Sequence, residues 1–221
     1  MAYEATLSRV ERYFDSTATA AWEALTSDAP VSRVRETVRA GRDAMRARLL
    51  ARLPDDLSGA RVLDAGCGTG AMSEALALRG AEVVGADISP ALLDVARRRM
   101  PGALSARVRF VAGDMLSDDL GSFDHVVAMD SLLYYGRADL VRALGRLSGR
   151  TRGSVLFTVA PRTPLLTAML AAGKLMPRAD RSPIMVPHGV RALERGLGRP
   201  LADLGRVRSG FYISHALELA P

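Results

Sequence analysis

The residues best suited to chemistry are two carboxylates, Asp64 and Asp87, with a turn between them that contains Gly66, Gly68 and Gly70. Glycine is needed where the backbone must approach a ligand closely or adopt a positive φ angle. An acidic side chain about 20 residues beyond the first glycine is placed to accept hydrogen bonds from ribose hydroxyls. The pattern therefore predicts a site for a ligand that contains a nucleoside.

The residues around this turn predict the elements that hold it. Val62 and Leu63 form a short apolar run, residues 71–78 have a helical composition, and residues 83–86 form a second apolar run. A strand, a helix and a second strand in this order make one βαβ unit with a right-handed crossover. Because Ala71 completes the spacing G-x-G-x-x-G/A, the glycines alone also permit a dinucleotide.

Carboxylates recur where later strands are expected to end. Strands are predicted for residues 108–112, 125–129 and 154–159, and Asp114 and Asp130 follow the first two. Ligands of open α/β sheets bind outside the carboxyl ends of the strands. With the two carboxylates of the βαβ unit, four acidic residues therefore mark this edge of the sheet as the expected site.

Helices are predicted from apolar periodicity and from capping residues. The segment 31–53 carries apolar residues at helical spacing, with Ser32 or Asp28 as its candidate cap. Ser89 followed by Pro90 predicts the start of another helix. Further helices are predicted for residues 138–147, 165–176 and 189–198, and a first short helix is expected to break at residues 15–17.

The C-terminal segment predicts a β-hairpin. Residues 204–208 and 211–218 are strand-like and are separated by Ser209 and Gly210, a turn signal. In the second strand one face is expected to carry Phe211, Ile213, His215 and Leu217.

The composition indicates one globular domain with appendages. The chain has 221 residues, of which 48% are hydrophobic, enough for a sizeable core. A single cysteine excludes an internal disulfide and favours a reducing compartment. We find no signal peptide and no uncharged apolar run long enough to span a bilayer, so a cytoplasmic location is expected. The net charge of +6 suits an anionic partner, but the arginines are dispersed along the chain, which disfavours nucleic acid.

The string from Asp64 to Gly70, D-A-G-C-G-T-G, resembles the D-x-G-C-G-T-G motif of class I methyltransferases that use S-adenosylmethionine. Their ligand is a nucleoside with a methionine tail and no pyrophosphate. The resemblance implies a Rossmann-like α/β fold in which a seven-stranded mixed sheet ends in an antiparallel hairpin. We accordingly divide the chain into an N-terminal helical arm, residues 1–54, and a cofactor-binding methyltransferase domain, residues 55–221.

Other segments carry a narrower resemblance; they are Tyr13–Thr17 with Trp22, Val38–Arg42, Ala160–Thr163, Phe211-Tyr212 and Leu217-Glu218. They are similar to the magnesium protoporphyrin IX O-methyltransferase family of chlorophyll and bacteriochlorophyll synthesis, most of all to its bacteriochlorophyll-type members. The resemblance implies methyl transfer from S-adenosylmethionine to a propionate carboxylate of magnesium protoporphyrin IX. S-adenosylhomocysteine is the second product, and magnesium enters only as part of the substrate.

The resemblance also assigns roles to residues of the predicted site. The glycines of the turn are expected to approach the methionine part of the cofactor, and Asp87 to accept its ribose hydroxyls. Asp114 is expected near the adenine amino group with Met115 beside it, and Met129 beneath the ligand. The expected cofactor-binding residues are Tyr13, Arg39, Asp64, Gly66, Gly68, Gly70, Asp87, Ile88, Asp114, Met115 and Met129.

Two residues of the arm and one beyond the fourth strand are expected to complete the site. Arg39 is assigned to the methionine carboxylate, and Tyr13 is expected to cover the sulfonium. Because a carboxylate with a pKa near 4 is already ionised at neutral pH, no general base is required. Tyr134 and Tyr13 are the candidate catalytic residues. The chain departs from chlorophyll-type relatives, which often carry His-Tyr where it has Tyr134-Tyr135 and a tyrosine where it has Thr26.

None of the three histidines is expected to bind a metal that belongs to the protein. His188, in a proline-flanked segment, is a minor candidate for an axial ligand to the magnesium of the substrate. His125 and His215 are expected to be structural, and Cys67 a residue of the turn rather than a nucleophile.

The expected partner is the magnesium porphyrin, and two further candidate partners are the large subunit of magnesium chelatase and the cytoplasmic face of the photosynthetic membrane. Rival functions are methylation of another small acceptor and a non-catalytic tetrapyrrole or cofactor carrier. Methylation of nucleic acid is disfavoured, because the fourth strand is followed by Met129-Asp130-Ser131-Leu132 and not by an N-P-P-[YF] motif.

Overall fold

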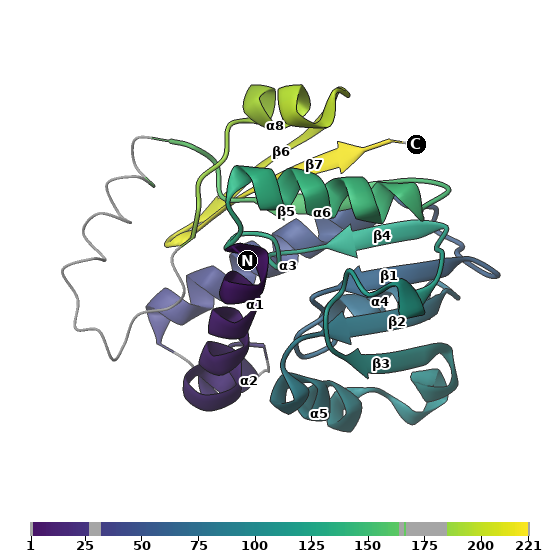
Figure 1. Cartoon of the computed structure of the whole chain (residues 1–221). Coiled ribbons are helices and arrows are strands. Elements are labelled where there is room, and N and C mark those ends of the chain that lie inside the picture. The colour runs from purple at the N-terminus through teal and green to yellow at the C-terminus, as the bar shows by residue number, and fades with distance from the viewer. Residues whose placement is uncertain (1, 27–31, 164–165, 167–184, 221) are drawn as a thin grey trace.

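A seven-stranded mixed sheet forms the centre of the protein in the computed structural model, which describes residues 2–26, 32–163, 166 and 185–220 (Figure 1). The strand order is β3-β2-β1-β4-β5-β7-β6. The strands β1 to β5 run parallel, whereas β7 is antiparallel to both β5 and β6. The predicted sheet and its C-terminal hairpin are confirmed. The strands are β1 (Arg61–Ala65), β2 (Glu82–Asp87), β3 (Val108–Ala112), β4 (His125–Ala128), β5 (Val155–Val159), β6 (Ala202–Ser209) and β7 (Tyr212–Leu219).

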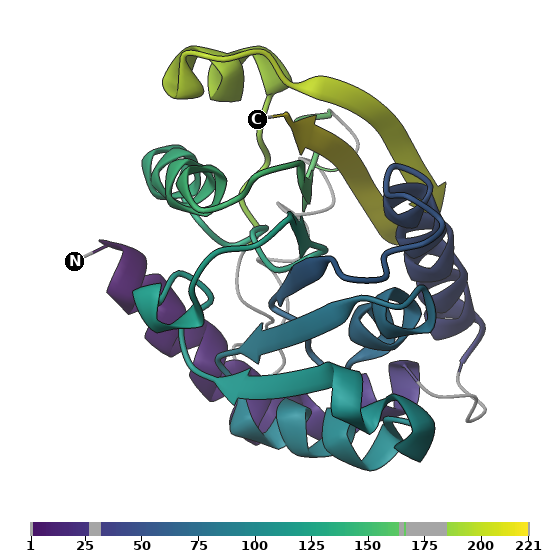
Figure 2. The same ribbon diagram turned by 90° about the vertical axis from the view of Figure 1, so that its right-hand side faces the viewer.

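Helices cover both faces of this sheet. The described α-helices are α1 (Ala2–Arg12), α2 (Thr19–Leu25), α3 (Arg33–Leu50), α4 (Ala71–Leu78), α5 (Pro90–Arg99), α6 (Arg137–Gly149) and α8 (Val190–Leu197). Successive strand residues point to opposite faces. Leu63 and Val126 therefore share a core with α6 and α8, while Val62 and Val127 share one with α3 and α4. Figure 2 shows α6 and α8 on the side of the sheet opposite to α3.

Two predicted helix starts are confirmed by their caps. The side chain of Ser32 accepts a hydrogen bond from the backbone N–H of Arg35, and α3 begins at the next residue. Ser89 likewise accepts one from Leu92, with Pro90 at the first position of α5. Helix α3 ends earlier than the predicted residue 53, and its Met45 and Leu49 are fully buried in the core of the sheet.

The expected break of the first helix at residues 15–17 is wrong. The chain continues from α1 through a π-helical segment, Tyr13–Ala18, directly into α2. Asp15 does not disrupt the helix, because its carboxylate is used elsewhere: it accepts hydrogen bonds from the Ser89 hydroxyl and, at 3.4 Å, from the backbone N–H of Ala91. This continuous arm crosses the carboxyl ends of the parallel strands (Figure 1).

The C-terminal hairpin differs from the prediction at its turn. Gly210, with a φ angle of 56°, and Phe211 connect the two strands, and Phe211 is 62% exposed. The expectation that Phe211 shares a strand face with His215 and Leu217 is therefore wrong, because the strand begins one residue later. The helix predicted for residues 165–176 lies almost entirely outside the described residues. Among the described helices, none combines the length and apolarity that crossing a membrane requires.

Candidate functional site

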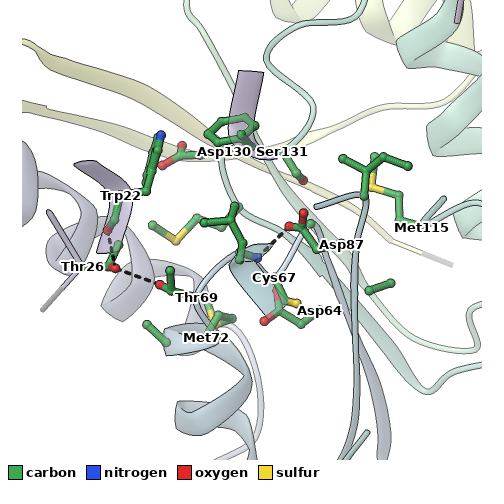
Figure 3. Close-up of a pocket in the computed structure, with 18 of the residues that line it drawn as sticks. Trp22, Thr26, Asp64, Cys67, Thr69, Met72, Asp87, Met115, Asp130 and Ser131 are labelled. Atoms are coloured by element: carbon green, nitrogen blue, oxygen red, sulfur yellow. Dashed lines mark hydrogen bonds between the residues drawn. The ribbon is translucent and has the colours of Figure 1, made fainter. Parts of the chain in front are cut away.

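A cavity of about 290 Å³ lies at the carboxyl ends of β1, β2 and β4 and is bordered by the arm (Figure 3). Small-molecule sites typically measure roughly 300–1,000 Å³, so its size suits a ligand. The glycine turn and the strand ends form one part of its wall, and Phe14 and Trp22 of the arm form another. The charged residues among those that line it are Arg39, Arg42, Asp43, Arg46, Asp64, Asp87 and Asp130.

The glycine turn presents bare backbone to this cavity. Gly66 and Gly68 line it with φ angles of 80° and 52°. A Cβ atom on Gly66 would overlap the side chain of Ser131, whereas one on Gly68 would meet no protein atom within 4 Å. The predicted ligand contact Gly70 lies outside the described lining, and a Cβ atom there would lie 3.2 Å from the ring of Phe110. Gly66 and Gly68 thus border the open space, while Gly70 serves packing.

Asp87 joins the end of β2 to the glycine turn. Its Oδ2 accepts a hydrogen bond from the backbone N–H of Gly68 at 2.8 Å, and its Oδ1 accepts one from that of Ser89 at 2.9 Å. Burial raises the pKa of the carboxyl, and these two donors oppose the rise. A carboxylate has about four acceptor positions. Asp87 therefore keeps lone pairs for the hydroxyls of a ligand in the cavity that it lines.

Asp64 is a second buried carboxylate beside the turn. It accepts a hydrogen bond from the hydroxyl of Ser73 at 2.6 Å. Burial, together with the negative charge of Asp87, raises its pKa to about 7 against the opposing effect of Ser73. Figure 3 shows Asp64 and Asp87 on either side of Cys67. Because it also lines the cavity, Asp64 is a group that gains or loses a proton near neutral pH at the ligand site.

Asp114 has a partner that the sequence did not indicate. Its Oδ1 accepts hydrogen bonds from the hydroxyl of Tyr3 at 2.7 Å and from the backbone N–H of Leu116 at 2.8 Å. Gly113 and Met115 line the cavity, whereas Asp114 lies outside the described lining. The first helix is thereby tied to the loop after β3, and the expected contact of Asp114 with adenine stays a prediction.

Asp130, two residues beyond β4, pairs with an arginine of α3. Its φ angle of 57° lies in the left-handed region, which is unusual for a residue other than glycine. Its Oδ2 lies 2.8 Å from Nη1 of Arg42, and the hydroxyl of Tyr212 donates to it at 3.0 Å. The guanidinium of Arg42 in turn lies 4.7 Å from the centre of the Trp22 ring. Sequence reasoning did not select this pair, although Arg42 belongs to a segment that carried the resemblance.

Aromatic residues of the arm meet Tyr134 beside the cavity. The ring of Phe14 lies 5.5 Å from that of Trp22 and 6.4 Å from that of Tyr134. Tyr134 lines the cavity, and burial with the nearby charge of Asp130 raises its pKa, so its hydroxyl stays protonated. The predicted residue Tyr13 packs against Phe14 at 5.1 Å but lies outside the described lining. Tyr134 is therefore a hydrogen-bond donor at neutral pH and not a base.

Polar contacts join helices of the arm to one another and to the body of the protein. Arg39 lines the cavity and donates to the carbonyls of residues 24 and 25 at 2.9 and 3.0 Å, which links α3 to α2. The hydroxyls of Thr26 and Thr69 lie 2.9 Å apart (Figure 3), and Arg99 of α5 donates to Thr26 at 2.8 Å. Thr26, where chlorophyll-type relatives often carry a tyrosine, thus connects the arm to the glycine turn.

The contacts and burial of His188, His215 and Cys67 indicate structural roles for these three residues. Nε2 of His188 lies 3.0 Å from the carbonyl of Tyr135, and burial lowers the pKa of His188, which keeps the ring neutral. His215 is buried and lies 2.7 Å from Asp203. Burial raises the pKa of Cys67 well above its ordinary value, so its thiol is a poor nucleophile. Within the described residues, no cluster of three or more His, Cys, Asp or Glu side chains is suited to a metal ion.

Most of the residues expected at the site converge on this one cavity. The structure leaves Tyr13, Gly70 and Asp114 outside its described lining. The expected residues that line it are Arg39, Asp64, Gly66, Gly68, Asp87, Ile88, Met115, Met129 and Tyr134.

Comparison with protein families gives two matches. Residues 128–221 match the model described as magnesium-protoporphyrin IX methyltransferase C-terminus. Residues 62–152, which include the glycine turn, match the model described as methyltransferase domain.

Individual relatives extend the similarity over nearly the whole chain. A magnesium-protoporphyrin O-methyltransferase of Rhodobacter capsulatus is 55% identical over 97% of this chain and 96% of its own. A chloroplastic magnesium protoporphyrin IX methyltransferase of Arabidopsis thaliana is 29% identical over 96% of this chain and 70% of its own. The crystal structure of magnesium protoporphyrin IX methyltransferase from Synechocystis PCC 6803 with bound S-adenosylhomocysteine has a TM-score of 0.80 at 29% identity, over 96% of this chain and 97% of that one.

Proposed function

The chain belongs to the magnesium-protoporphyrin O-methyltransferase family, and from this premise we propose that it methylates a propionate carboxylate of magnesium protoporphyrin IX. The methyl donor is S-adenosylmethionine, and the products are the monomethyl ester and S-adenosylhomocysteine. The reaction is a step of chlorophyll or bacteriochlorophyll synthesis. The observation that carries the proposal is the 55% identity to a magnesium-protoporphyrin O-methyltransferase over 97% of this chain.

The residues of the cavity fit the methyl donor. When bound, S-adenosylmethionine supplies a methyl group on a cationic sulfur. The bare backbone at Gly66 and Gly68 suits a close approach of its methionine part, and the free lone pairs of Asp87 suit its ribose. We assign the adenine to Met115 and the methionine carboxylate to Arg39; these roles rest on the family resemblance and on the position of both residues at the cavity, which Ile88 also lines.

The chemistry requires alignment rather than proton transfer. A propionate with an ordinary pKa near 4 is ionised at neutral pH, so it needs no general base. Holding the carboxylate oxygen in line with the methyl group is worth roughly 7–11 kcal/mol of the barrier. We propose that Tyr134, whose hydroxyl stays protonated, donates a hydrogen bond that orients the acceptor. Phe14 and Trp22 of the arm line the cavity, and we propose that these apolar rings exclude water from the reacting groups.

The direct test is a product assay with two acceptors. The purified protein is incubated with S-adenosylmethionine and either magnesium protoporphyrin IX or the metal-free porphyrin, and the monomethyl ester is sought by chromatography and mass. Ester from the magnesium porphyrin is the expected result, and the metal-free reaction shows whether the ion is needed. If neither porphyrin is esterified while S-adenosylhomocysteine still binds, the protein methylates another acceptor or carries the cofactor without turnover.

We further propose that the enzyme works in the cytoplasm against an anionic membrane surface. Val34 at the start of α3 and Phe211 in the hairpin turn are 50% and 62% exposed. The turn packs on α3, since a Cβ atom on Gly210 would overlap Thr37. Exposed apolar side chains flanked by arginines suit a bilayer with acidic headgroups. The exposed arginines in these two segments are Arg33, Arg35, Arg206 and Arg208.

Vesicle sedimentation tests this surface. We expect the protein to sediment with anionic vesicles at low salt, less at high salt, and less after Phe211→Ser. The idea is wrong if the protein stays in the supernatant under all conditions. An interaction with the large subunit of magnesium chelatase stays a prediction from the family resemblance.

A further inference from the structure

The guanidinium of Arg42 lies at the wall of the cavity, and most of its N–H donors have no partner among the described residues. Its Nη1 donates to Asp130 at 2.8 Å, and its charge lies over the ring of Trp22 at 4.7 Å. Arginine carries five N–H donors in a rigid fork. Within the described part of the chain, the guanidinium of Arg42 donates one hydrogen bond, to Asp130. Arg42 therefore has donors available to an anion that enters the cavity.

Asp130 is itself fixed by side chains from two other strands. The hydroxyl of Tyr212 donates to both of its carboxylate oxygens, at 3.1 and 3.0 Å, and that of Thr158 donates to Oδ1 at 3.1 Å. The hydroxyl of Ser214 adds a contact at 3.3 Å. The Asp130 side chain is 6% exposed, so this cluster is shielded from water. Arg42 is thereby immobilised by groups from β5, β7 and the loop after β4.

The Arg42–Asp130 pair lies beside the aromatic part of the cavity. Arg42, Asp130 and Tyr134 all line the cavity. Figure 3 shows Trp22 and Asp130 at one side of the cavity and Met115 at the other. Met115, which is assigned to the adenine, thus lies away from Asp130, the partner of Arg42. The Arg42 guanidinium lies over Trp22, whose ring contacts Phe14, so an aromatic surface that suits a flat acceptor adjoins it.

We propose that Arg42 binds a carboxylate of the acceptor and that Asp130 is the residue that positions Arg42. The proposal rests on the proposed function, since it takes the acceptor to be a porphyrin propionate. A guanidinium fork matches a carboxylate in geometry. The negative charge of Asp130 offsets that of Arg42, so the pair orients an anionic nucleophile without the full loss of reactivity that a lone cation would cause. Arg39 suits this role less well than Arg42, because two of its guanidinium nitrogens donate to backbone carbonyls of α2.

The test compares a diacid with a neutral diester. Binding of magnesium protoporphyrin IX and of its dimethyl ester is measured by absorbance titration without cofactor, and S-adenosylhomocysteine binding by calorimetry. Because Arg42→Gln alone leaves Asp130 buried without its cation, the main variant is the double substitution Arg42→Gln with Asp130→Asn. Arg195→Gln, which changes an exposed arginine on α8 outside the cavity lining, is the control.

We expect the double variant to bind the diacid roughly 10- to 100-fold more weakly than the wild type, the range of one charge-assisted hydrogen bond. Binding of the diester and of S-adenosylhomocysteine should be unchanged, and Arg195→Gln should match the wild type. Wild-type binding of the diacid by the double variant overturns the proposal, because Arg42 then only neutralises Asp130. Weaker binding of S-adenosylhomocysteine with unchanged diacid binding also overturns it, since Arg42 then holds the cofactor carboxylate.

Failure of the proposed function is recognised separately. If the wild-type protein forms no ester from magnesium protoporphyrin IX, the proposed activity fails whatever the variants do. If the wild type forms the ester and the double variant distinguishes diacid from diester as the wild type does, the activity stands and the role of Arg42 is wrong.

Discussion

The backbone N–H of Gly68 donates a hydrogen bond to the carboxylate of Asp87, which joins the turn after β1 to the end of β2. The two residues are 19 positions apart, and this bond makes the glycine spacing and the acidic residue parts of one unit. Asp87 therefore has two roles: it holds the turn, and it is placed to accept hydrogen bonds from a ligand. The sequence motif is informative because both requirements fall on the same residue.

Asp87→Asn is expected to weaken cofactor binding and to destabilise the fold. The amide can accept from one of the two backbone donors, at Gly68 or Ser89, but it turns an NH₂ group towards the other. Leaving a buried donor unpaired costs about 1–3 kcal/mol. We expect a loss of that size in the free energy of unfolding and roughly a 10-fold or greater loss in S-adenosylhomocysteine affinity by calorimetry. Asp94→Asn, exposed on α5, should change neither quantity.

Tyr134→Phe is expected to slow methyl transfer without altering cofactor affinity or the pH profile. The raised pKa of Tyr134 keeps its hydroxyl protonated, so the substitution removes a donor and not a base. A neutral hydrogen bond contributes about 0.5–1.5 kcal/mol, which corresponds to a loss of roughly 2- to 12-fold in kcat/KM. Initial rates between pH 6 and pH 9 check this. A wild-type rate that rises with pH through a step that the variant lacks would show that Tyr134 acts as a base.

Asp64→Asn is expected to stabilise the protein above pH 7. Burial raises the pKa of Asp64 to about 7, so the folded state holds a proton that the unfolded state has already lost above pH 4. The wild type therefore loses stability from this group as pH rises from about 4 to about 7, and the loss is constant at higher pH. Its upper bound is on the order of 4 kcal/mol, at about 1.4 kcal/mol for each pH unit between the two pKa values. Asparagine avoids this loss and can still accept from Ser73.

Urea unfolding of the wild type and of Asp64→Asn at pH 5, 6, 7 and 8.5 measures the difference. The gain should grow with pH and level off above pH 7. Asp94→Asn, which changes an exposed carboxylate on α5, serves as the control. A gain from Asp64→Asn that is equal at pH 5 and pH 8.5 would show that the carboxylate titrates normally.

The features predicted best from the sequence depend on neighbours in the chain. The strand–turn–helix unit follows from an apolar run, a glycine turn and a helical segment within a few residues of one another. The Ser89 cap and the hairpin turn at Gly210 were predictable because capping and turn formation are local. Asp64 and Asp87 were found for the same reason, since each directly ends an apolar run.

The parts of the site that were missed depend on contacts between distant residues. Arg42 and Asp130 are 88 positions apart, and Tyr3 and Asp114 are 111 apart, so no local pattern links them. The continuous helix through Tyr13–Ala18 was missed because Asp15 uses its carboxylate on α5, a contact that exists only in the folded protein. Local propensity is a weak predictor where a tertiary contact satisfies the residue.

Gly41→Ala and Gly145→Ala form a matched pair that tests the packing behind Arg42. Both glycines lie inside helices, where alanine is favoured by about 0.8–1 kcal/mol. A Cβ atom on Gly145 would meet nothing within 4 Å, so Gly145→Ala should stabilise the protein by about that amount in urea unfolding. A Cβ atom on Gly41 would lie 2.5 Å from Cδ1 of Tyr212, and overpacking of this kind costs about 1–3 kcal/mol.

Gly41→Ala should therefore lower the free energy of unfolding or leave it unchanged, and it should also weaken binding of magnesium protoporphyrin IX. The reason is that Tyr212 must shift, and its hydroxyl holds Asp130, which holds Arg42. Tyr212→Phe separates the two effects, because it keeps the ring against Gly41 and removes the hydroxyl. If Gly41→Ala stabilises the protein as much as Gly145→Ala does, the inference that Tyr212 leaves no room for a Cβ atom on Gly41 is wrong. If Tyr212→Phe binds the porphyrin diacid as tightly as the wild type, its hydroxyl does not position Arg42.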